Sequence, residues 1–419
     1  MGLPMVGIHS GSELSKTSNF ASYSSGGYDA NMGIDSSGNI YVAYLTGTLV
    51  KFNTKSQIVW QKTLSGMSIQ AMDVDSSGNI YLAGTAGSYP TPTGIVVKID
   101  TNGSITWQRG YQLTQWSNSG GNVSVDSSGN VYCGFWYGPS NNDYADFAKY
   151  NSSGTIQWRL QITHPTLYYN CRPGAIATDS SGNSYMGAHT YNSSFGWESY
   201  AIKVNSSGTV QWQRKIAHAS NSVFISYETF IDSSGNVYFY GFQSASRRSP
   251  YLIKLNSSGS ILWQKNIAVT DNDLYPGHAR FDGTYFYIQA WGTKVGDSYN
   301  KAWTLTIDTS GTIVSQKSLS MDSLSVYTYG IAVSSTHIHT AGYGPYKWLT
   351  KTPVSGSKKI GTYPGIGHTF TYDVSTYSLE NSTASGSSGS LSISSVSATS
   401  ASTNVALTDA AGTYAVRSF

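Results

Sequence analysis

Charged side chains are scarce in this chain, because Asp, Glu, Lys and Arg make up 11% of its 419 residues and the net charge is only +3. A nucleic-acid partner requires basic residues concentrated in one stripe or patch. Lysine instead recurs about every fifty residues, at Lys51, Lys98, Lys149, Lys203 and Lys254. This spacing predicts a ring of widely separated lysines on solvated strand edges. We therefore expect no nucleic-acid partner.

Cysteines and long apolar runs are also nearly missing. The two cysteines, Cys133 and Cys171, are too few for a disulfide framework, and the sequence leaves open whether they pair. No apolar run is long enough to span a bilayer, and the opening MGLPMVGIHSGSELSK lacks the basic and apolar regions of a signal peptide. We expect no membrane insertion and no export by the usual route.

What the chain does contain is one unit of about fifty residues, written repeatedly. Its first half reads DSSGNIY and its second half ends in Trp-Gln-Lys/Arg, as in IKVNSSGTVQWQR. The first half begins at Asp35, Asp75, Asp126, Asp179 and Asp232, and decayed copies lie at Asp282 and Ser334. The intervals are 40, 51, 53, 53, 50 and 52 residues, which gives seven units.

Each half of the unit alternates apolar and polar residues around a short polar turn, which is the pattern of a β-hairpin. Asp can hydrogen-bond the turn backbone, and Gly accepts the positive φ that such a turn needs. Two hairpins per unit form a four-stranded antiparallel sheet, which must stack on its neighbours around an axis. The sequence predicts an all-β, seven-bladed β-propeller of four-stranded antiparallel blades with a small β-rich C-terminal extension.

The ends of the chain depart from the repeat. Residues 1–27 read as an N-terminal arm or ring-closing strand, residues 28–363 as the propeller, and residues 364–419 as a Ser/Thr-rich extension. In the extension we expect one strand over 369–380 and a terminal hairpin over 405–419. Propellers commonly close by mixing strands from both termini, so the degenerate seventh unit is the expected place of closure.

Large aromatic residues recur at fixed places in the unit. A residue present in every blade serves a need that every blade shares, and packing between blades is the favoured interpretation. The recurring tryptophans are Trp60, Trp107, Trp158, Trp212 and Trp263, and the recurring tyrosines are Tyr41, Tyr81, Tyr132, Tyr185 and Tyr238.

We call the four strands of a unit A to D in chain order. The constant A–B and C–D turns must then lie on one side of the disc. The variable B–C and D–A loops then form the opposite side, where function on a repeated scaffold usually lies. These loops are rich in aromatic residues, which suit the C–H faces of sugar rings. An alternative is that many of them only plug the loop bases. The ligand-binding candidates are Trp116, Trp136, Tyr137, Tyr168, Tyr169, Trp197, Tyr227, Tyr275, Trp291, Tyr299 and Tyr346, and the same loops hold Tyr327 and Tyr329.

The sequence gives less support for metal-binding or catalytic residues than for a ligand-binding face. His164, His218 and His278 fall in successive D–A loops, which is too far apart for ligands of one metal ion. The acids of this face could supply a glycosidase-like pair, but no spacing selects one. They are Asp143, Asp146, Glu198, Glu228, Asp271, Asp273, Asp297 and Asp322. We expect no metal, no cofactor and no catalytic residue.

Two resemblances follow from these motifs. The units resemble the broad β-propeller repeat group, with D-x-x-G-N-x-Y-V-x-G in strands A and B, and strands C and D are similar to quinoprotein repeats. The chain has no adjacent Cys pair, so we expect no quinone cofactor. The run NSSGTVQWQRKI and the ending TDAAGTYAVRSF resemble tandem-repeat structural proteins of marine tailed phages.

A Ser-, Thr-, Gly- and Tyr-rich surface without an export signal suggests release by lysis, as for virion components. We therefore expect a non-enzymatic structural or attachment protein of a bacteriophage virion. Its expected partners are other virion proteins and host surface glycan, bound by the aromatic loop face. The alternatives are a polysaccharide lyase or glycosidase acting on that same face, or a decoration protein without a ligand.

Overall fold

The computed structural model describes the strands and turns of the repeats and short segments of both ends. The described residues are 5–9, 30–55, 57–87, 93–111, 121–137, 144–163, 170–192, 196–217, 223–244, 248–268, 274–293, 298–321, 324–343, 347–354, 361–364, 369–374, 378–381, 385–388, 392–395 and 406–409. Every regular element among them is a β-strand. None of these segments forms a helix that is long and apolar enough to cross a membrane.

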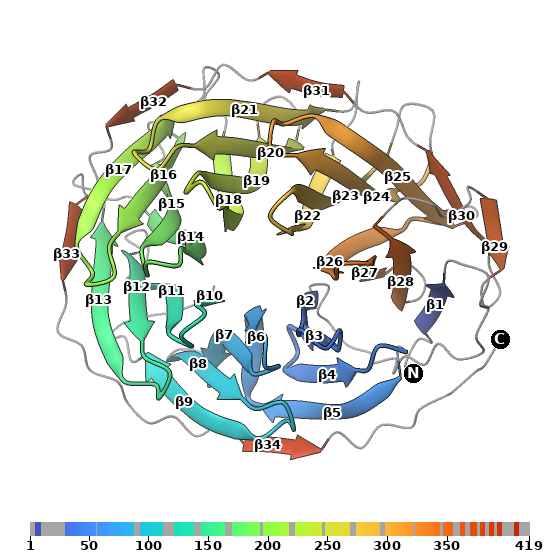
Figure 1. The fold of residues 1–419 in the computed structure, drawn as a ribbon, viewed down its shortest axis with the longest axis horizontal. Helices are drawn as coiled ribbons and strands as arrows, with labels where there is room; N and C mark the ends of the chain where they lie inside the picture. The colour runs from blue at the N-terminus through green and yellow to red at the C-terminus, as the bar shows by residue number, and fades with distance from the viewer. Residues whose placement is uncertain are drawn as a thin grey trace.

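Six four-stranded antiparallel blades follow one another around a central axis, as Figure 1 shows. Blades 1 to 3 consist of β2 (Ala30–Ile34), β3 (Ile40–Tyr44), β4 (Thr48–Phe52) and β5 (Ile58–Ser65); β6 (Met67–Val74), β7 (Ile80–Ala86), β8 (Thr93–Ile99) and β9 (Ile105–Tyr111); and β10 (Gly121–Val125), β11 (Val131–Tyr137), β12 (Tyr144–Tyr150) and β13 (Ile156–Thr163). Blades 4 to 6 consist of β14 (Asn170–Thr178), β15 (Ser184–Asn192), β16 (Gly196–Val204) and β17 (Val210–Ala217); β18 (Val223–Ile231), β19 (Val237–Ser244), β20 (Arg248–Leu255) and β21 (Ile261–Ala268); and β22 (Leu274–Phe281), β23 (Tyr285–Gly292), β24 (Lys301–Asp308) and β25 (Ile313–Met321).

The seventh repeat forms a smaller sheet of a different kind. It has three antiparallel strands, β26 (Tyr327–Val333), β27 (His337–Tyr343) and β28 (Lys347–Pro353). The N-terminal strand β1 (Met5–His9) pairs with β28 in parallel. The prediction of seven four-stranded antiparallel blades is therefore wrong for the last unit. Its second hairpin, LTKTPVSGSKK, lacks the tryptophan and the apolar alternation that build a fourth strand in the other units.

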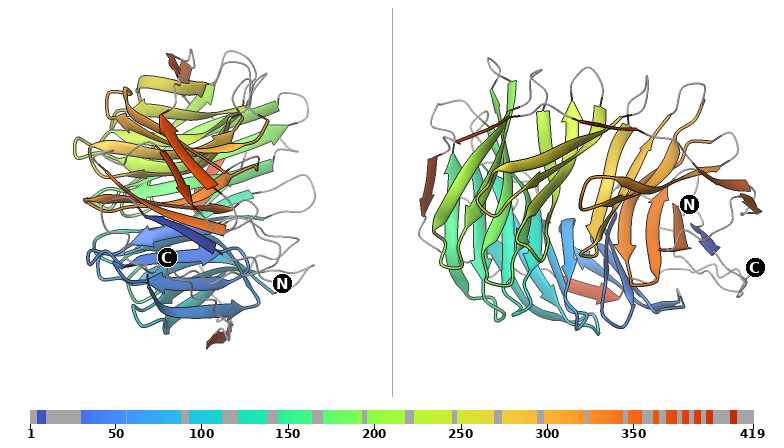
Figure 2. Two further views of the ribbon diagram at one scale, coloured as in Figure 1. Left: turned by 90° about the vertical axis from the view of Figure 1, so that its right-hand side faces the viewer. Right: turned by 45° about the horizontal axis from the view of Figure 1, so that its top comes forward.

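The C-terminal extension runs backwards around the outside of the disc, where Figures 1 and 2 show its short strands. On blade 6, β30 (Thr369–Val374) pairs with β25 and with β29 (Gly361–Pro364). Four strands then add to blades 5, 4, 3 and 1 in that order: β31 (Ser378–Asn381), β32 (Ser385–Ser388), β33 (Ser392–Ser395) and β34 (Ala406–Asp409). Blade 2 has four strands among the described residues.

This arrangement corrects two predictions about the extension. The single strand expected over 369–380 is two strands, β30 and β31, on different blades. Of the hairpin expected over 405–419, only β34 is described, and it pairs with β5 of blade 1 instead. Its other residues lie outside the described segments.

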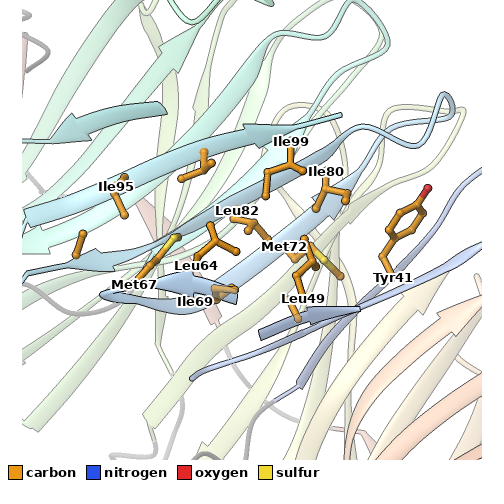
Figure 3. Packing of buried hydrophobic residues seen from close by; sticks show 13 residues of the cluster. Tyr41, Leu49, Leu64, Met67, Ile69, Met72, Ile80, Leu82, Ile95 and Ile99 are labelled. Atoms are coloured by element: carbon orange, nitrogen blue, oxygen red, sulfur yellow. The ribbon is translucent and has the colours of Figure 1, made fainter. Parts of the chain in front are cut away.

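The hydrophobic core lies between blades. One cluster joins Leu49 and Leu64 of blade 1 to Met72, Leu82 and Ile95 of blade 2, as Figure 3 shows. Such fully buried aliphatic side chains each stabilise the fold by about 1.5–3 kcal/mol. The stack of blades, rather than any single blade, is therefore the stable unit.

Polar contacts join each blade to the next, as predicted for the recurring aromatic residues. In blade 1, the Tyr41 hydroxyl donates to Asp35 at 3.0 Å, and the Trp60 indole N–H donates to the carbonyl of Thr101 in blade 2 at 3.1 Å. The equivalent indoles donate to turn carbonyls of the following blade at Trp107, Trp158, Trp212 and Trp263.

The recurring lysines take part in this same contact between blades. Lys51 Nζ lies 5.3 Å from the centre of the Tyr41 ring and donates to the Thr101 carbonyl at 3.0 Å. Equivalent cation–π contacts of 5.0–5.3 Å occur at Lys98, Lys149, Lys203 and Lys254. The prediction of solvated strand edges is therefore wrong, because each lysine packs over a tyrosine and several reach the next blade.

The innermost strands carry a feature with no counterpart in the predictions. Strands β6, β14, β18, β22 and β26 each contain a register shift against the following strand. An extra residue in one strand bends it and re-aims its side chains, often next to a binding site. At the shift in β6 the two backbones approach closely, which explains why residue 84 is glycine. A Cβ on Gly84 would lie 2.0 Å from the Ser68 carbonyl oxygen.

Candidate functional site

The constant turns confirm that the two sides of the disc differ. The Asp35 carboxylate accepts hydrogen bonds from the N–H groups of Ser37 and Asn39, and Gly38 has a φ of 82°. The same turn recurs in blades 2 to 5. These side chains are committed to turn structure, so a ligand site must be sought on the opposite, variable side.

The described residues include part of the predicted binding face. Side chains are described for Trp136, Tyr227, Tyr275, Trp291 and Tyr299. Tyr137 lies in β11 and Trp197 in β16. The remaining candidates lie outside the described residues: Trp116, Tyr168, Tyr169 and Tyr346.

Four aromatic rings of β22, β23 and β26 pack together on the variable side, and we call them the aromatic quartet. Tyr275 and Trp291 are a direct cross-strand pair, and their rings stack with centres 4.2 Å apart and planes 7° apart. Tyr327 meets Trp291 edge-on at 4.8 Å, and Tyr329 lies 6.4 Å from it. All four rings are half-buried, so the quartet retains exposed aromatic surface.

Trp136 lies on another part of the ring, between blades 3 and 4. The guanidinium of Arg172 sits 4.5 Å from the centre of its ring. His189 is the cross-strand neighbour of Arg172, and burial, assisted by the arginine charge, lowers its pKa to about 3. This imidazole is neutral at physiological pH, and the group is an inter-blade contact rather than an acid–base pair.

Ionisable side chains of the inner strands meet near the axis, and we call Asp73, Glu228, His278 and Arg280 the axial group. His278 Nδ1 lies 2.6 Å from Glu228 Oε1, which also accepts from Arg280 Nη1 at 3.2 Å. Arg280 Nη2 donates to the carbonyl of Met32 in blade 1 at 2.7 Å. Arg280 thus links blades 5, 6 and 1.

The pKa values of the two acids, Glu228 and Asp73, are shifted in opposite directions. Burial would raise the pKa of Glu228, but the charge of Arg280 and the contact with His278 outweigh it, and that pKa is lowered. Burial raises the pKa of Asp73, although it accepts the N–H of Val125 at 2.8 Å. Glu228 is therefore ionised at neutral pH, and its contact orients the imidazole with the proton on Nδ1.

The sequence singled out Glu228 and His278 separately, as members of an acid list and a histidine list. Arg280 was missed, because its role depends on reaching from blade 6 to blade 1. The register shift in β22 between Pro276 and Ala279 places His278 differently from a regular strand, and nothing in the sequence spacing shows that shift. Among the other predicted acids, Asp146 is fully buried in an ion pair with Arg159 at 2.6 Å, which fits a structural role.

The described residues contain no cluster of three or more His, Cys, Asp or Glu side chains arranged to hold a metal ion. Cys133 and Cys171 are buried and do not form a disulfide with each other, which answers the question left open by the sequence. Tyr227 and Tyr299 are exposed. Tyr227 is the extra residue of the β18 register shift, next to Glu228.

A family model described as outer membrane protein assembly factor BamB matches residues 5–293. The chain belongs to this family. Membership in the BamB family confirms the resemblance to β-propeller repeats, whereas the prediction of a phage relative gains no support from it. No curated protein matches the sequence.

Solved structures similar to this BamB-family chain include an ulvan lyase, with a TM-score of 0.53 and 10% identity over 81% of this chain and 96% of the lyase. The lyase bound to -[GlcA(1-4)Rha3S]- gives a TM-score of 0.52 at the same identity and coverage. BamB from Moraxella catarrhalis has 13% identity over 74% of this chain and 81% of its own, with a TM-score of 0.42. At these identities the structures indicate the fold alone.

Proposed function

We propose that this protein is a non-enzymatic propeller that binds glycan through the aromatic quartet of blade 6 and the neighbouring β26–β28 sheet. The observation that carries the proposal is the Tyr275–Trp291 stack with Tyr327 and Tyr329 around it. Half-buried, prearranged aromatic rings beside polar groups are the usual means of holding a sugar ring. The family is described as an outer membrane protein assembly factor.

The location we propose is a bacteriophage virion, where the propeller would attach the particle to host surface glycan or to another virion protein. Many copies on one particle would let weak sites act together. The support is the composition and the soft resemblance of the repeats to phage structural proteins. Mass spectrometry of purified particles tests this location, and absence of the chain from them contradicts it.

A glycan array probed with the full chain and with Trp291→Ala tests the binding site. We expect the wild type to bind a subset of glycans, and the variant to lose about twofold to tenfold in affinity, since a ring contact is worth about 0.5–1.5 kcal/mol and about 1.4 kcal/mol is tenfold. Trp263→Ala is the matched control, because Trp263 donates to the Thr309 carbonyl on the turn side. It should lower stability and leave binding unchanged; equal loss in both variants contradicts the site.

A second candidate is a polysaccharide-cleaving enzyme, favoured by the fold shared with the ulvan lyase. A reducing-end assay on every glycan that binds separates the two functions. Release of new reducing ends supports the enzyme, and binding without release supports the attachment protein.

A further inference from the structure

We infer that the aromatic quartet and the axial group form one site, and that this site accepts uncharged sugars and rejects uronates. The inference rests on the proposed function, because it names the class of glycan that the quartet would hold. It goes beyond that function by assigning Glu228 a role in specificity.

The two groups share strand β22, which holds Tyr275 of the quartet and His278 and Arg280 of the axial group. Tyr275 and His278 are separated by three positions of β22, or at most about 10 Å at the rise of a β-strand. A Cβ added to Gly277 would lie 3.0 Å from the carbonyl oxygen of Thr328, the residue before Tyr329. The register shifts of β22 and β26 therefore meet beside the quartet.

The axial group offers polar atoms to a ligand. Described contacts account for three N–H groups of Arg280, those to Glu228, Met32 and Ala279, out of the five that a guanidinium carries. His278 uses Nδ1 for Glu228, which leaves Nε2 as its second hydrogen-bonding atom. The side chains of His278 and Arg280 are 26% and 25% exposed, so part of each side chain is open to a ligand.

The charges of the axial group determine which sugars fit. The guanidinium of Arg280 is already balanced by the carboxylate of Glu228 at 3.2 Å. Asp73 adds a second carboxyl that interacts with both residues. A sugar carboxylate placed here would meet like charge without a cation of its own, whereas a neutral hydroxyl finds both donors and an acceptor.

Matched pairs of hexose and hexuronic acid oligosaccharides, measured by calorimetry with the full chain, test the inference. We expect the neutral member of a pair to bind at least about tenfold more tightly. Glu228→Gln leaves the Arg280 charge unbalanced and should reduce that preference at least about tenfold or reverse it. Asp100→Asn, which removes a carboxylate from a turn on the opposite side, is the matched control and should keep the preference.

Because Glu228→Gln could fail to fold, the wild type provides an independent measurement. Raising the salt concentration screens like-charge repulsion, so uronate binding should strengthen with salt while neutral binding stays constant. Tighter binding of the uronates, or a preference that neither salt nor Glu228→Gln changes, overturns the inference and leaves glycan binding intact. Failure of every glycan to bind, by contrast, overturns the proposed function as well.

Discussion

At the scale of single residues, a recurring tyrosine, aspartate, lysine and tryptophan join blade 1 to blade 2, and the same residue types recur in blades 2 to 5. The tyrosine is buried against the aspartate of its own turn, and the lysine and tryptophan reach the carbonyl of the following blade. Their fixed period in the sequence was sufficient to predict the packing role of the aromatic residues. It could not predict the full lysine contact, because a single repeat does not show which carbonyl the next blade places beside the lysine.

Alkaline pH should therefore weaken the stack of blades. Burial, with the Asp35 carboxylate as hydrogen-bond acceptor, raises the pKa of Tyr41 from 10.0 to about 12. The folded state favours the neutral phenol, so the stability it contributes is complete below pH 10.0 and is lost as the pH rises through about 12. Urea unfolding of the wild type across this range should show a falling free energy of unfolding.

The control for this prediction is Tyr41→Phe. At neutral pH it should cost about 1.5–3 kcal/mol, the value of one hydrogen bond to a carboxylate. Above pH 10.0 its stability should fall less steeply than that of the wild type, because one titrating phenol is gone. Parallel pH profiles for the two proteins would show that Tyr41 does not carry the effect.

At the scale of elements, the two features that matter most are the register shifts of the inner strands and the fifth strands of the tail. The shifts involve one extra residue in strands whose loops vary in length, so no spacing in the sequence reveals them. The tail strands, such as SGSS and SISS, lack apolar alternation. Backbone pairing with strand edges holds them, and backbone pairing leaves no pattern in the side chains.

Deleting residues 375–419 should expose the outer edges of four blades without unfolding the propeller. Amides of β21, β17, β13 and β5 that pair with the tail should exchange hydrogen about fivefold to tenfold faster, since each net hydrogen bond is worth about 1 kcal/mol. Strand β9 of blade 2 is the internal control, because its sheet has four strands among the described residues. Unchanged exchange in the four paired strands would contradict the tail pairing.

At the scale of the whole molecule, the repeat period predicted the propeller and the side of the disc that varies. It overcounted the complete blades, because the seventh unit retains its first hairpin and has lost the pattern of its second. It also pointed to Tyr275 and Trp291 among eleven candidates without showing that they stack. Their meeting depends on the pairing of β22 with β23, and the contact of Arg280 with the Met32 carbonyl depends on closure of the ring.

The most direct test of glycan binding at this site is a crystal structure of the full chain with the neutral oligosaccharide that binds best. We expect a sugar ring against the aromatic quartet of blade 6 and the β26–β28 sheet, with a hydroxyl hydrogen-bonded to His278 or Arg280. A sugar bound on the turn side of the disc, or on the variable side away from Trp291, would contradict it.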